Sequence, residues 1–431
     1  MPLRNAVLGA FALLLVLCVA LGRPVALALA AGWALFSAYA LHEGFSVRDV
    51  CRMSSKGIRQ IGPILLSLAM IGMLTASWRA SGTIAVIVSD LSTFVNPGAF
   101  LLFAFLSNAF LSVLMGTSFG TAATMGVVAA SLGASFSVPS LLTAGAVMSG
   151  IYFGDRWSPM STSAMLTAAV TGTRVRQNLP PMLARGTPAF ILAAALYFVL
   201  GLWYQGSGEV PDIAGLFSSG FRLDPLCWIP ALLVVLLVLF RIGIRMTIAV
   251  SIASAFLLAV FLQGLGPMEV VKALLFGYES RVPHLRALMD GGGAVSFALP
   301  ITIMVISGTY AGLFEGTGLL GGIEGLVRTV AKRVSVFASI LFAAAGACMV
   351  SCNQSFAIML LSSLARGVRP DRQRLALDIE DSVITVAALI PWSVAAAVPL
   401  AVLGVGPAAL PLAFFLWLLP LSRLLLDRGK L

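Results

Sequence analysis

Charged residues are scarce in this chain. Asp, Glu, Lys and Arg together make up only 10% of its 431 residues, whereas 59% are hydrophobic, and the mean hydropathy is +1.02. A soluble domain of this length needs far more charge to cover its surface. The composition therefore excludes a soluble protein and predicts a polytopic membrane protein whose surroundings are the lipid bilayer.

Histidine and cysteine are also few, at two and five residues. His42 and His284 lie far apart, and Cys348 and Cys352 have no neighbouring histidine or third thiol with which to form a metal site. No nucleophile–base pair can be identified either. We therefore expect no enzyme activity and no cofactor.

Acidic residues are the minority, 17 against 27 basic residues, which gives a net charge of +10. The basic residues are spread through short segments between apolar runs. This is the pattern that orients membrane proteins with their positive segments in the cytoplasm. It argues against nucleic acid as a partner, and it predicts that both termini lie on the cytoplasmic side of a bacterial-type inner membrane.

The chain is organised around a polar interruption, Gly154–Ser161, inside the apolar run Ser140–Thr173. A helix of 34 residues would be about 50 Å long, whereas a bilayer core is about 30 Å thick. Irregular backbone at membrane depth is tolerated only where protein or a water-filled cavity covers it. The carboxylate of Asp155 in this interruption predicts a transport site.

Further apolar runs extend this pattern along the chain. A leading pair, 5–21 and 24–41, is interpreted as two retained helices and not as a signal peptide, because the second follows the first at once. Two runs with polar centres, 98–133 and 334–365, are predicted to be hairpins of half-helices. The run 375–405 is predicted to be a second broken span, interrupted at Glu380–Ser382 and again at Pro391. The prediction is all-α, with about ten crossing segments plus two hairpins.

The two halves share landmarks at an offset of about 236 residues. The pairs are Pro63 and Pro300, Trp78 and Phe314, Ser81-Gly82 and Thr317-Gly318, and Thr117 and Asn353, followed by Asp155 and Asp381 in the two broken spans. The predicted topology gives the halves opposite orientations, as in many secondary transporters. Chance is the alternative, because alanine- and glycine-rich sequence aligns easily with itself.

The predicted organisation has five parts. They are an N-terminal helix pair with a cytoplasmic loop (1–59), a first inverted repeat (60–185), connecting helices (186–290), a second inverted repeat (291–408), and a C-terminal helix with its tail (409–431). The segments 42–60 and 79–97 are expected to be a cytoplasmic loop and an external segment. The helices 186–204, 225–240 and 246–263 are expected to lie between the repeats.

Several motifs resemble those of the NhaC family of Na⁺/H⁺ antiporters, over roughly residues 60–425. They are Gly-Thr-Ser-Phe-Gly-Thr (116–121), Tyr-Phe-Gly-Asp-Arg-Trp-Ser-Pro-Met-Ser (152–161), Thr-Gly-Leu-Leu (317–320) after Glu315, Glu-Asp-Ser (380–382) and Leu-Ile-Pro-Trp (389–392). The resemblance implies an inverted-repeat antiporter that exchanges Na⁺ and H⁺ by alternating access. It also implies a homodimer, although no segment of the sequence marks an interface.

The chain departs from the family pattern at three places. Thr162, Ser163 and Ala164 follow Ser161 where the family usually has Asp-Thr-Thr. The second break reads Glu-Asp-Ser-Val-Ile and ends Pro-Trp-Ser, where the family has Glu-Asp-Ser-Gly-Thr and Pro-Trp-Asn. One expected carboxylate is therefore missing. This favours the alternative substrate, a small organic anion or amino acid whose transport is coupled to Na⁺ or H⁺.

The predicted ion and substrate site gathers oxygen-bearing side chains from all four interruptions. The residues are Asp155, Ser158, Ser161 and Thr162, with Thr117, Ser118 and Thr121 facing them, and Asp381, Ser382 and Thr385, with Asn353, Gln354 and Ser355 facing those. A hard cation such as Na⁺ prefers oxygen ligands. Asp155 and Asp381 are the candidate Na⁺ and proton sites, and Glu380 and Glu315 are further candidates.

Each assignment has a structural alternative. Asp155 could form an ion pair with Arg156, Glu380 could cap or solvate a helix entry, and Glu315 could be solvated at a membrane face. The hydroxyl groups could satisfy backbone groups only. A channel is a further alternative, but no filter repeat is visible. A membrane enzyme lacks reactive clusters, and a scaffold has no need of paired polar breaks at midplane.

Overall fold

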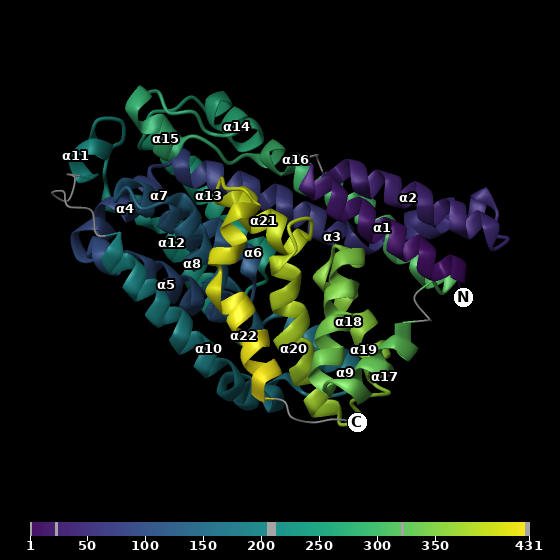
Figure 1. Cartoon of the computed structure of the whole chain (residues 1–431). Helices are drawn as coiled ribbons and strands as arrows, with labels where there is room; N and C mark the ends of the chain where they lie inside the picture. The colour runs from purple at the N-terminus through teal and green to yellow at the C-terminus, as the bar shows by residue number, and fades with distance from the viewer. Residues whose placement is uncertain (1, 22–24, 205–212, 320–322, 427–431) are drawn as a thin grey trace.

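The computed structural model describes residues 2–21, 25–204, 213–319 and 323–426. Within these ranges the chain is almost entirely helical, and the only β feature is an isolated bridge between Tyr278 and Gly291 (Figure 1). The end of the predicted C-terminal tail, residues 427–431, lies outside the described residues. The all-α prediction is confirmed.

Apolar helices confirm a polytopic membrane protein. In the described part of the chain, four helices are long and apolar enough to cross a membrane, or six if each of two bent pairs is one span. Several apolar helices of 10–17 residues accompany them. The number of about ten crossing segments stays a prediction.

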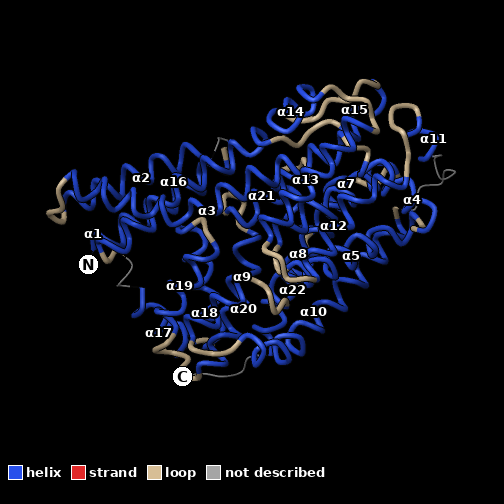
Figure 2. The backbone as a smooth tube through the Cα atoms, turned by 180° about the vertical axis from the view of Figure 1, so that it is seen from behind, coloured by secondary structure: helices blue, strands red, loops and turns tan. Residues whose placement is uncertain are grey.

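The N-terminal helices pack in one layer with α16. This layer consists of α1 (Pro2–Ala20), α2 (Val25–His42), α3 (Val47–Ala80) and α16 (Ala298–Thr317). Figures 1 and 2 show them side by side from two directions. Edge-on ring contacts with centroids 4.8–5.5 Å apart join α1, α2 and α16 through Phe11, Phe36, Tyr310 and Phe314, a geometry that aromatic pairs prefer. The predicted helix pair is therefore present.

The predicted cytoplasmic loop 42–60 is wrong for most of its length, because α3 already begins at Val47. Ser46 and Asp49 form a capping box: the Ser46 hydroxyl accepts from the Asp49 N–H at 3.2 Å, and the Asp49 carboxylate accepts from the Ser46 N–H at 3.1 Å. The Arg, Lys, Met and Gln residues that follow are good helix formers. A helix that extends beyond the membrane carries basic residues as readily as a loop does.

The segment 79–97, predicted as external, is also mostly helical. α4 (Thr83–Phe94) follows α3 at an angle of 68°, and its residues from Thr83 to Ser89 are buried. The bend falls at Gly82, whose φ of +75° favours glycine. Charge and hydropathy alone did not distinguish this packed helix from a solvated connection.

Both predicted hairpins and the first broken span have their breaks where the polar residues lie. The first hairpin comprises α5 (Phe100–Met115), α6 (Ser118–Thr121), the π-helical turn η2 (Ala122–Gly126) and α7 (Val127–Ser135). The first broken span comprises α8 (Ser140–Trp157) and α9 (Thr162–Thr171). The second hairpin comprises α18 (Val336–Ser351) and α19 (Gln354–Ala365).

The second broken span differs from its prediction. α20 (Arg372–Leu389) runs unbroken through Glu380–Ser382, and the chain bends by 54° only before α21 (Val394–Val402). The break contains Pro391, which disfavours helical backbone at the residue before it. The expected interruption at Glu380–Ser382 is therefore wrong, because acidic residues inside a helix do not break it when other groups balance their charges.

The remaining helices connect and cover these elements. They are α10 (Val175–Trp203), α11 (Ile213–Ser218), α12 (Ile229–Leu239), α13 (Ile244–Phe261), α14 (Pro267–Phe276), α15 (Arg286–Met289), α17 (Ile323–Arg333) and α22 (Phe414–Leu426). The three predicted connecting helices correspond to α10, α12 and α13. In Figure 1, α17, α18 and α19 lie near the C-terminus, and α14 and α15 lie at the opposite end of the molecule.

Candidate functional site

The first hairpin break lies directly against the first broken span. Gly116 ends α5 with φ +64°, and a Cβ added there would lie 2.6 Å from the carbonyl carbon of Met160. Ser158 fixes the same contact, because its hydroxyl donates to the Val113 carbonyl at 2.6 Å. Only glycine allows this approach, so the two polar breaks meet at one point.

The second pair of breaks meets in the same way. Cys352 ends α18 with φ +53°, and its carbonyl accepts from the Val394 N–H at 3.0 Å. The Trp392 indole donates to the Met349 carbonyl at 3.0 Å. Backbone groups left free by one break therefore bond to the other, as buried backbone requires.

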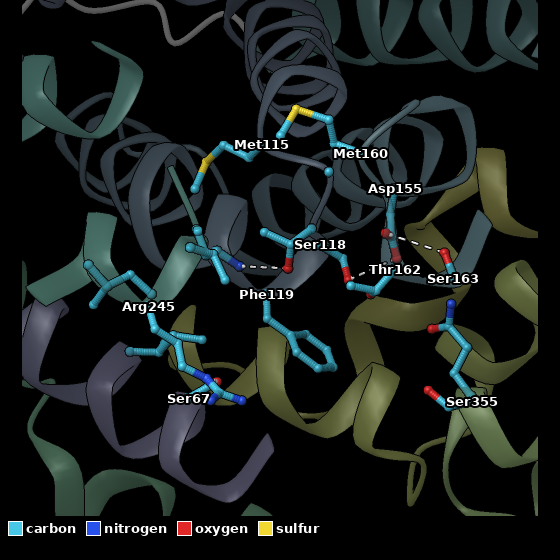
Figure 3. Close-up of a pocket in the computed structure, with 18 of the residues that line it drawn as sticks. Ser67, Met115, Ser118, Phe119, Asp155, Met160, Thr162, Ser163, Arg245 and Ser355 are labelled. Carbon is cyan, nitrogen blue, oxygen red and sulfur yellow. Dashed lines mark hydrogen bonds between the residues drawn. The ribbon is translucent and has the colours of Figure 1, made fainter. Parts of the chain in front are cut away.

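All four breaks border one cavity of about 410 Å³. Its walls include Gly116–Gly120, Thr162 and Ser163, Asn353–Ser355, and Val394 and Ala395, together with α3 and the turn between α12 and α13. Figure 3 shows Asp155 and Ser163 on one side of the cavity and Arg245 and Ser67 on another. The cavity thus has a carboxylate side and a guanidinium side.

Asp155 lies in the last turn of α8, only 5% exposed. Three hydroxyl oxygens lie within hydrogen-bond distance of its carboxylate: Ser161 at 2.9 Å, Ser118 at 3.3 Å and Ser163 at 3.5 Å. The Ser161 and Ser163 oxygens are 2.7 Å apart, so when Ser161 donates to the carboxylate, Ser163 can donate to Ser161. The structure therefore surrounds one buried carboxylate with hydroxyl oxygens from the start of α9 and from the first hairpin.

Ser163 was not among the predicted site residues. It stands two positions after Ser161, at the start of α9, where its side chain turns back toward the carboxylate. The run of hydroxyl residues from 161 to 163 was the available signal, and only its first two members were used.

Several predicted residues instead support the local backbone. Thr117 accepts from the Gly120 N–H at 3.4 Å, and Thr121 donates to the Thr117 carbonyl at 2.8 Å. Asn353 caps α19 by accepting from the Ser355 N–H at 2.9 Å. Thr117, Asn353, Gln354 and Ser355 line the cavity as well, so the second hairpin faces Asp155.

The structure does not bring Asp381 to this cavity. Asp381 is fully buried and forms ion pairs with Arg156, with Arg185 at 3.2 Å and with Arg423 at 3.5 Å. Arg156 is also fully buried and donates to the Met182 carbonyl at 2.9 Å. The arginine next to Asp155 is thus paired with Asp381.

The other predicted residues of α20 bond within their own helix. Ser382 donates to the Asp378 carbonyl at 2.6 Å, and Thr385 donates to the Ser382 carbonyl at 3.1 Å. Glu380 is buried in mid-helix, where it faces Thr167 and the charge of Arg156. The alternatives of helix capping and solvation are therefore wrong for Glu380. Glu315 belongs to α16 by its backbone, and its side chain lies outside the described residues.

Asp378 was missed. Its carboxylate is buried and bonds Arg369 at 2.6 Å and Arg185 at 3.0 Å. It lies three residues before Asp381, so both carboxylates share one face of α20. This spacing was visible, but the two arginines were interpreted only as orientation signals.

Comparison with known proteins adds independent findings. The model of the "Na+/H+ antiporter family" matches residues 3–173 and 150–426. The Malate-2H(+)/Na(+)-lactate antiporter of Bacillus subtilis is 28% identical over 428 residues, covering 96% of this chain and 90% of that protein. The Na(+)/H(+) antiporter NhaC of the same organism is 27% identical over 410 residues, covering 92% and 90%. The Arginine/ornithine antiporter ArcD of Halobacterium salinarum is 27% identical over 357 residues, covering 79% and 73%.

Proposed function

Because the chain belongs to the Na⁺/H⁺ antiporter family and is an ion-coupled antiporter of the membrane, not an enzyme, we propose that Na⁺ and H⁺ compete for Asp155. The observation that carries this proposal is the buried carboxylate with three serine hydroxyls around it at the edge of a cavity. The site either holds the cation or holds the proton, and that exclusion couples the two fluxes.

The local chemistry suits a sodium ion. Na⁺ is a hard cation and is held by carboxylate, hydroxyl and carbonyl oxygens. The hydroxyls of Ser118, Ser161 and Ser163 lie within hydrogen-bond distance of Asp155, and each can rotate to present a lone pair to a cation instead. A carboxylate this deeply buried is costly as an unpaired ion. It therefore needs either a cation or a proton as its partner.

The inverted repeat is part of the proposal, and its support lies in the backbone. Gly116 and Cys352 both end half-helices with positive φ, and they are 236 positions apart. Thr117 and Asn353, at the same offset, both cap the next helix through their side chains. Equivalent breaks at one offset favour two related halves with the substrate between them. In this proposal the parts 60–185 and 291–408 move against each other.

The orientation is also proposed. Basic residues gather around the starts of α10 and α20 and near the end of α22, and this distribution favours the cytoplasmic side for both termini. The same distribution makes the segment that carries α14 and α15 external.

A liposome assay tests the function. Purified protein is reconstituted with a pH-sensitive dye inside, and Na⁺ is added outside. Inward movement of Na⁺ in exchange for H⁺ is expected to make the lumen more alkaline without any organic solute. Asp155→Asn is expected to abolish the signal, while Asp371→Asn, an exposed aspartate at the start of α20, retains it. Equal activity in both variants would exclude Asp155 from the reaction.

The cavity favours one second candidate, exchange of a small organic carboxylate or amino acid. A volume of about 410 Å³ is in the range of small-molecule pockets. Arg241 and Arg245 line it, and Arg245 lies across the cavity from Asp155 (Figure 3). A guanidinium binds a carboxylate with two hydrogen bonds. Two of the relatives are named for such solutes. Arg245→Gln is expected to abolish uptake of a labelled C3–C4 carboxylate while Na⁺/H⁺ exchange persists; uptake that this variant leaves unchanged excludes a role for Arg245.

A further inference from the structure

A second cavity lies at the other end of α8. It has a volume of about 320 Å³, and its lining residues include Arg79, Thr143, Asp290 and Leu403. They come from the end of α3, the start of α8, the segment after α15 and the end of α21. No element of the proposed function uses this cavity.

The two cavities share three walls. On α8, Asp155 borders the first cavity and Thr143 and Ala144 border the second. Val147 and Ile151 fall between them at helical spacing and are fully buried. At about 1.5 Å per residue, the cavities are separated by roughly 16 Å along this helix.

The same order recurs on α3 and α21. On each helix, one residue lines the first cavity and the residue four positions later lies between the two cavities. The residue after another four positions lines the second cavity. On α3 these are Ile71, Thr75 and Arg79, and on α21 they are Val394, Val398 and Val402. Residues four apart lie on one helix face, so three separate helices align the two cavities along a common direction.

The π-helical turn η2 lies between these walls. Residues Ala122–Gly126 contact α3, α8 and α21, and all of them except Met125 are buried. A Cβ added at Gly126 would lie 3.2 Å from Cγ1 of Val147 and 3.5 Å from Cδ2 of Leu403, which lines the second cavity. A π-helical turn has i→i+5 hydrogen bonds and is rare inside α-helices, and such turns are frequent at functional sites.

We propose that the two cavities are the two ends of one transport path and that the turn Ala122–Gly126 is the gate that closes it in this structure. With the gate closed, Asp155 communicates with the first cavity only. Displacement of the turn from Val147 joins the second cavity, which Arg79 helps to line, to the same carboxylate. This proposal rests on the proposed function for the identity of the transported ion. The position of the path does not depend on it.

Thiol labelling tests the path without any substrate. In a background with alanine at Cys18, Cys51, Cys227 and Cys348, and glycine at Cys352 because of its positive φ, single cysteines are placed at three sites. Thr143→Cys samples the second cavity, Ser67→Cys samples the first, and Ala193→Cys is a fully buried control on α10.

A membrane-impermeant thiol reagent is then applied from one face of the membrane at a time. We expect Thr143→Cys to react from the external face, Ser67→Cys from the cytoplasmic face, and Ala193→Cys from neither. Labelling of the first two from the same face would overturn the proposal, as would a Thr143→Cys variant as unreactive as the control. Because labelling requires no transport, the result is independent of whether Na⁺ is the cargo.

A reversible crosslink tests the gate. The hypothetical Cβ of residue 126 lies within the range from which a disulfide to position 147 can form. In Gly126→Cys/Val147→Cys, oxidation is expected to stop exchange and reduction to restore it, whereas each single variant is indifferent to the oxidant. A crosslinked protein that continues to exchange overturns the gate. Failure to crosslink would show that these residues are not in contact in the membrane and overturns it as well.

Discussion

The fully buried ion pair between Arg156 and Asp381 gives the sharpest prediction about stability. Asp381→Asn removes the only carboxylate that the Arg156 guanidinium contacts by an ion pair in the described structure, and it also removes a partner of Arg185 and Arg423. Breaking a buried pair by neutralising one partner typically costs about 3–5 kcal/mol, because a charge is left without compensation. At about 1.4 kcal/mol per factor of ten in an equilibrium constant, the ratio of folded to unfolded protein falls by about two to three and a half orders of magnitude.

Asp371→Asn is the matched control. Asp371 faces Arg374 at 3.7 Å with both side chains more than half exposed, and such pairs contribute about 0–1 kcal/mol. Asparagine also preserves the cap that Asp371 provides for α20. Both variants replace an aspartate by asparagine, and the two positions differ in how deeply the side chain is buried.

The assay is thermal unfolding in detergent, followed by the reaction of a thiol-specific dye with Cys227, Cys348 and Cys352, which are buried in the native fold. We expect a markedly lower midpoint for Asp381→Asn and no change for Asp371→Asn. Asp381→Glu should recover much of the loss, because it keeps the charge. Equal unfolding midpoints for the two asparagine variants would refute the reasoning. Asp381 would then be a candidate ion-binding residue that does not stabilise the fold.

Three further predictions concern the surroundings of the site. Gly154→Ala should lower the free energy of unfolding by several kcal/mol, because the new Cβ would lie 2.3 Å from the Ser112 Cβ. Gly346→Ala on α18, where the added Cβ meets open space, should be neutral or slightly stabilising. The same dye assay measures both variants. Tyr197→Phe should cost about 1–3 kcal/mol, because the hydroxyl bonds Ser149 and the Gly145 and Leu412 carbonyls, and an unchanged midpoint would contradict this. Ser161→Ala should raise the Na⁺ concentration for half-maximal exchange by about ten- to a hundredfold, since a hydrogen bond or ligand to a charged group contributes about 1.5–3 kcal/mol. Ser363→Ala, on the exposed side of α19, should leave this concentration unchanged.

The positions of the breaks could be predicted from the sequence because their causes are local. Gly116, Pro159 and Asn353 interrupt apolar runs that are too long for single spans, and the structure has breaks at or beside all three. The second broken span was placed partly wrongly, because polarity was treated as a cause of breaking. Pro391 changes the backbone, whereas Asp381 and Ser382 do not.

The partners of the charged residues could not be predicted in this way. Arg156 stands beside Asp155 in sequence but points to a helix 225 positions further along the chain. Successive side chains of a helix diverge by about 100°, so adjacency gave no information on pairing. The cavity is likewise a property of packing: α3 and the turn between α12 and α13 complete it, and no local pattern connected them with the breaks.

The central claim is that one carboxylate, Asp155, binds either Na⁺ or a proton. The most direct measurement is equilibrium binding of ²²Na⁺ to purified protein across a range of pH, with the protons released on binding counted in weakly buffered solution. The account predicts that Na⁺ binding weakens as the pH falls and releases protons, and that Asp155→Asn shows neither binding nor release while Asp371→Asn shows both. Na⁺ binding with the same pH dependence and proton release in Asp155→Asn would contradict the account.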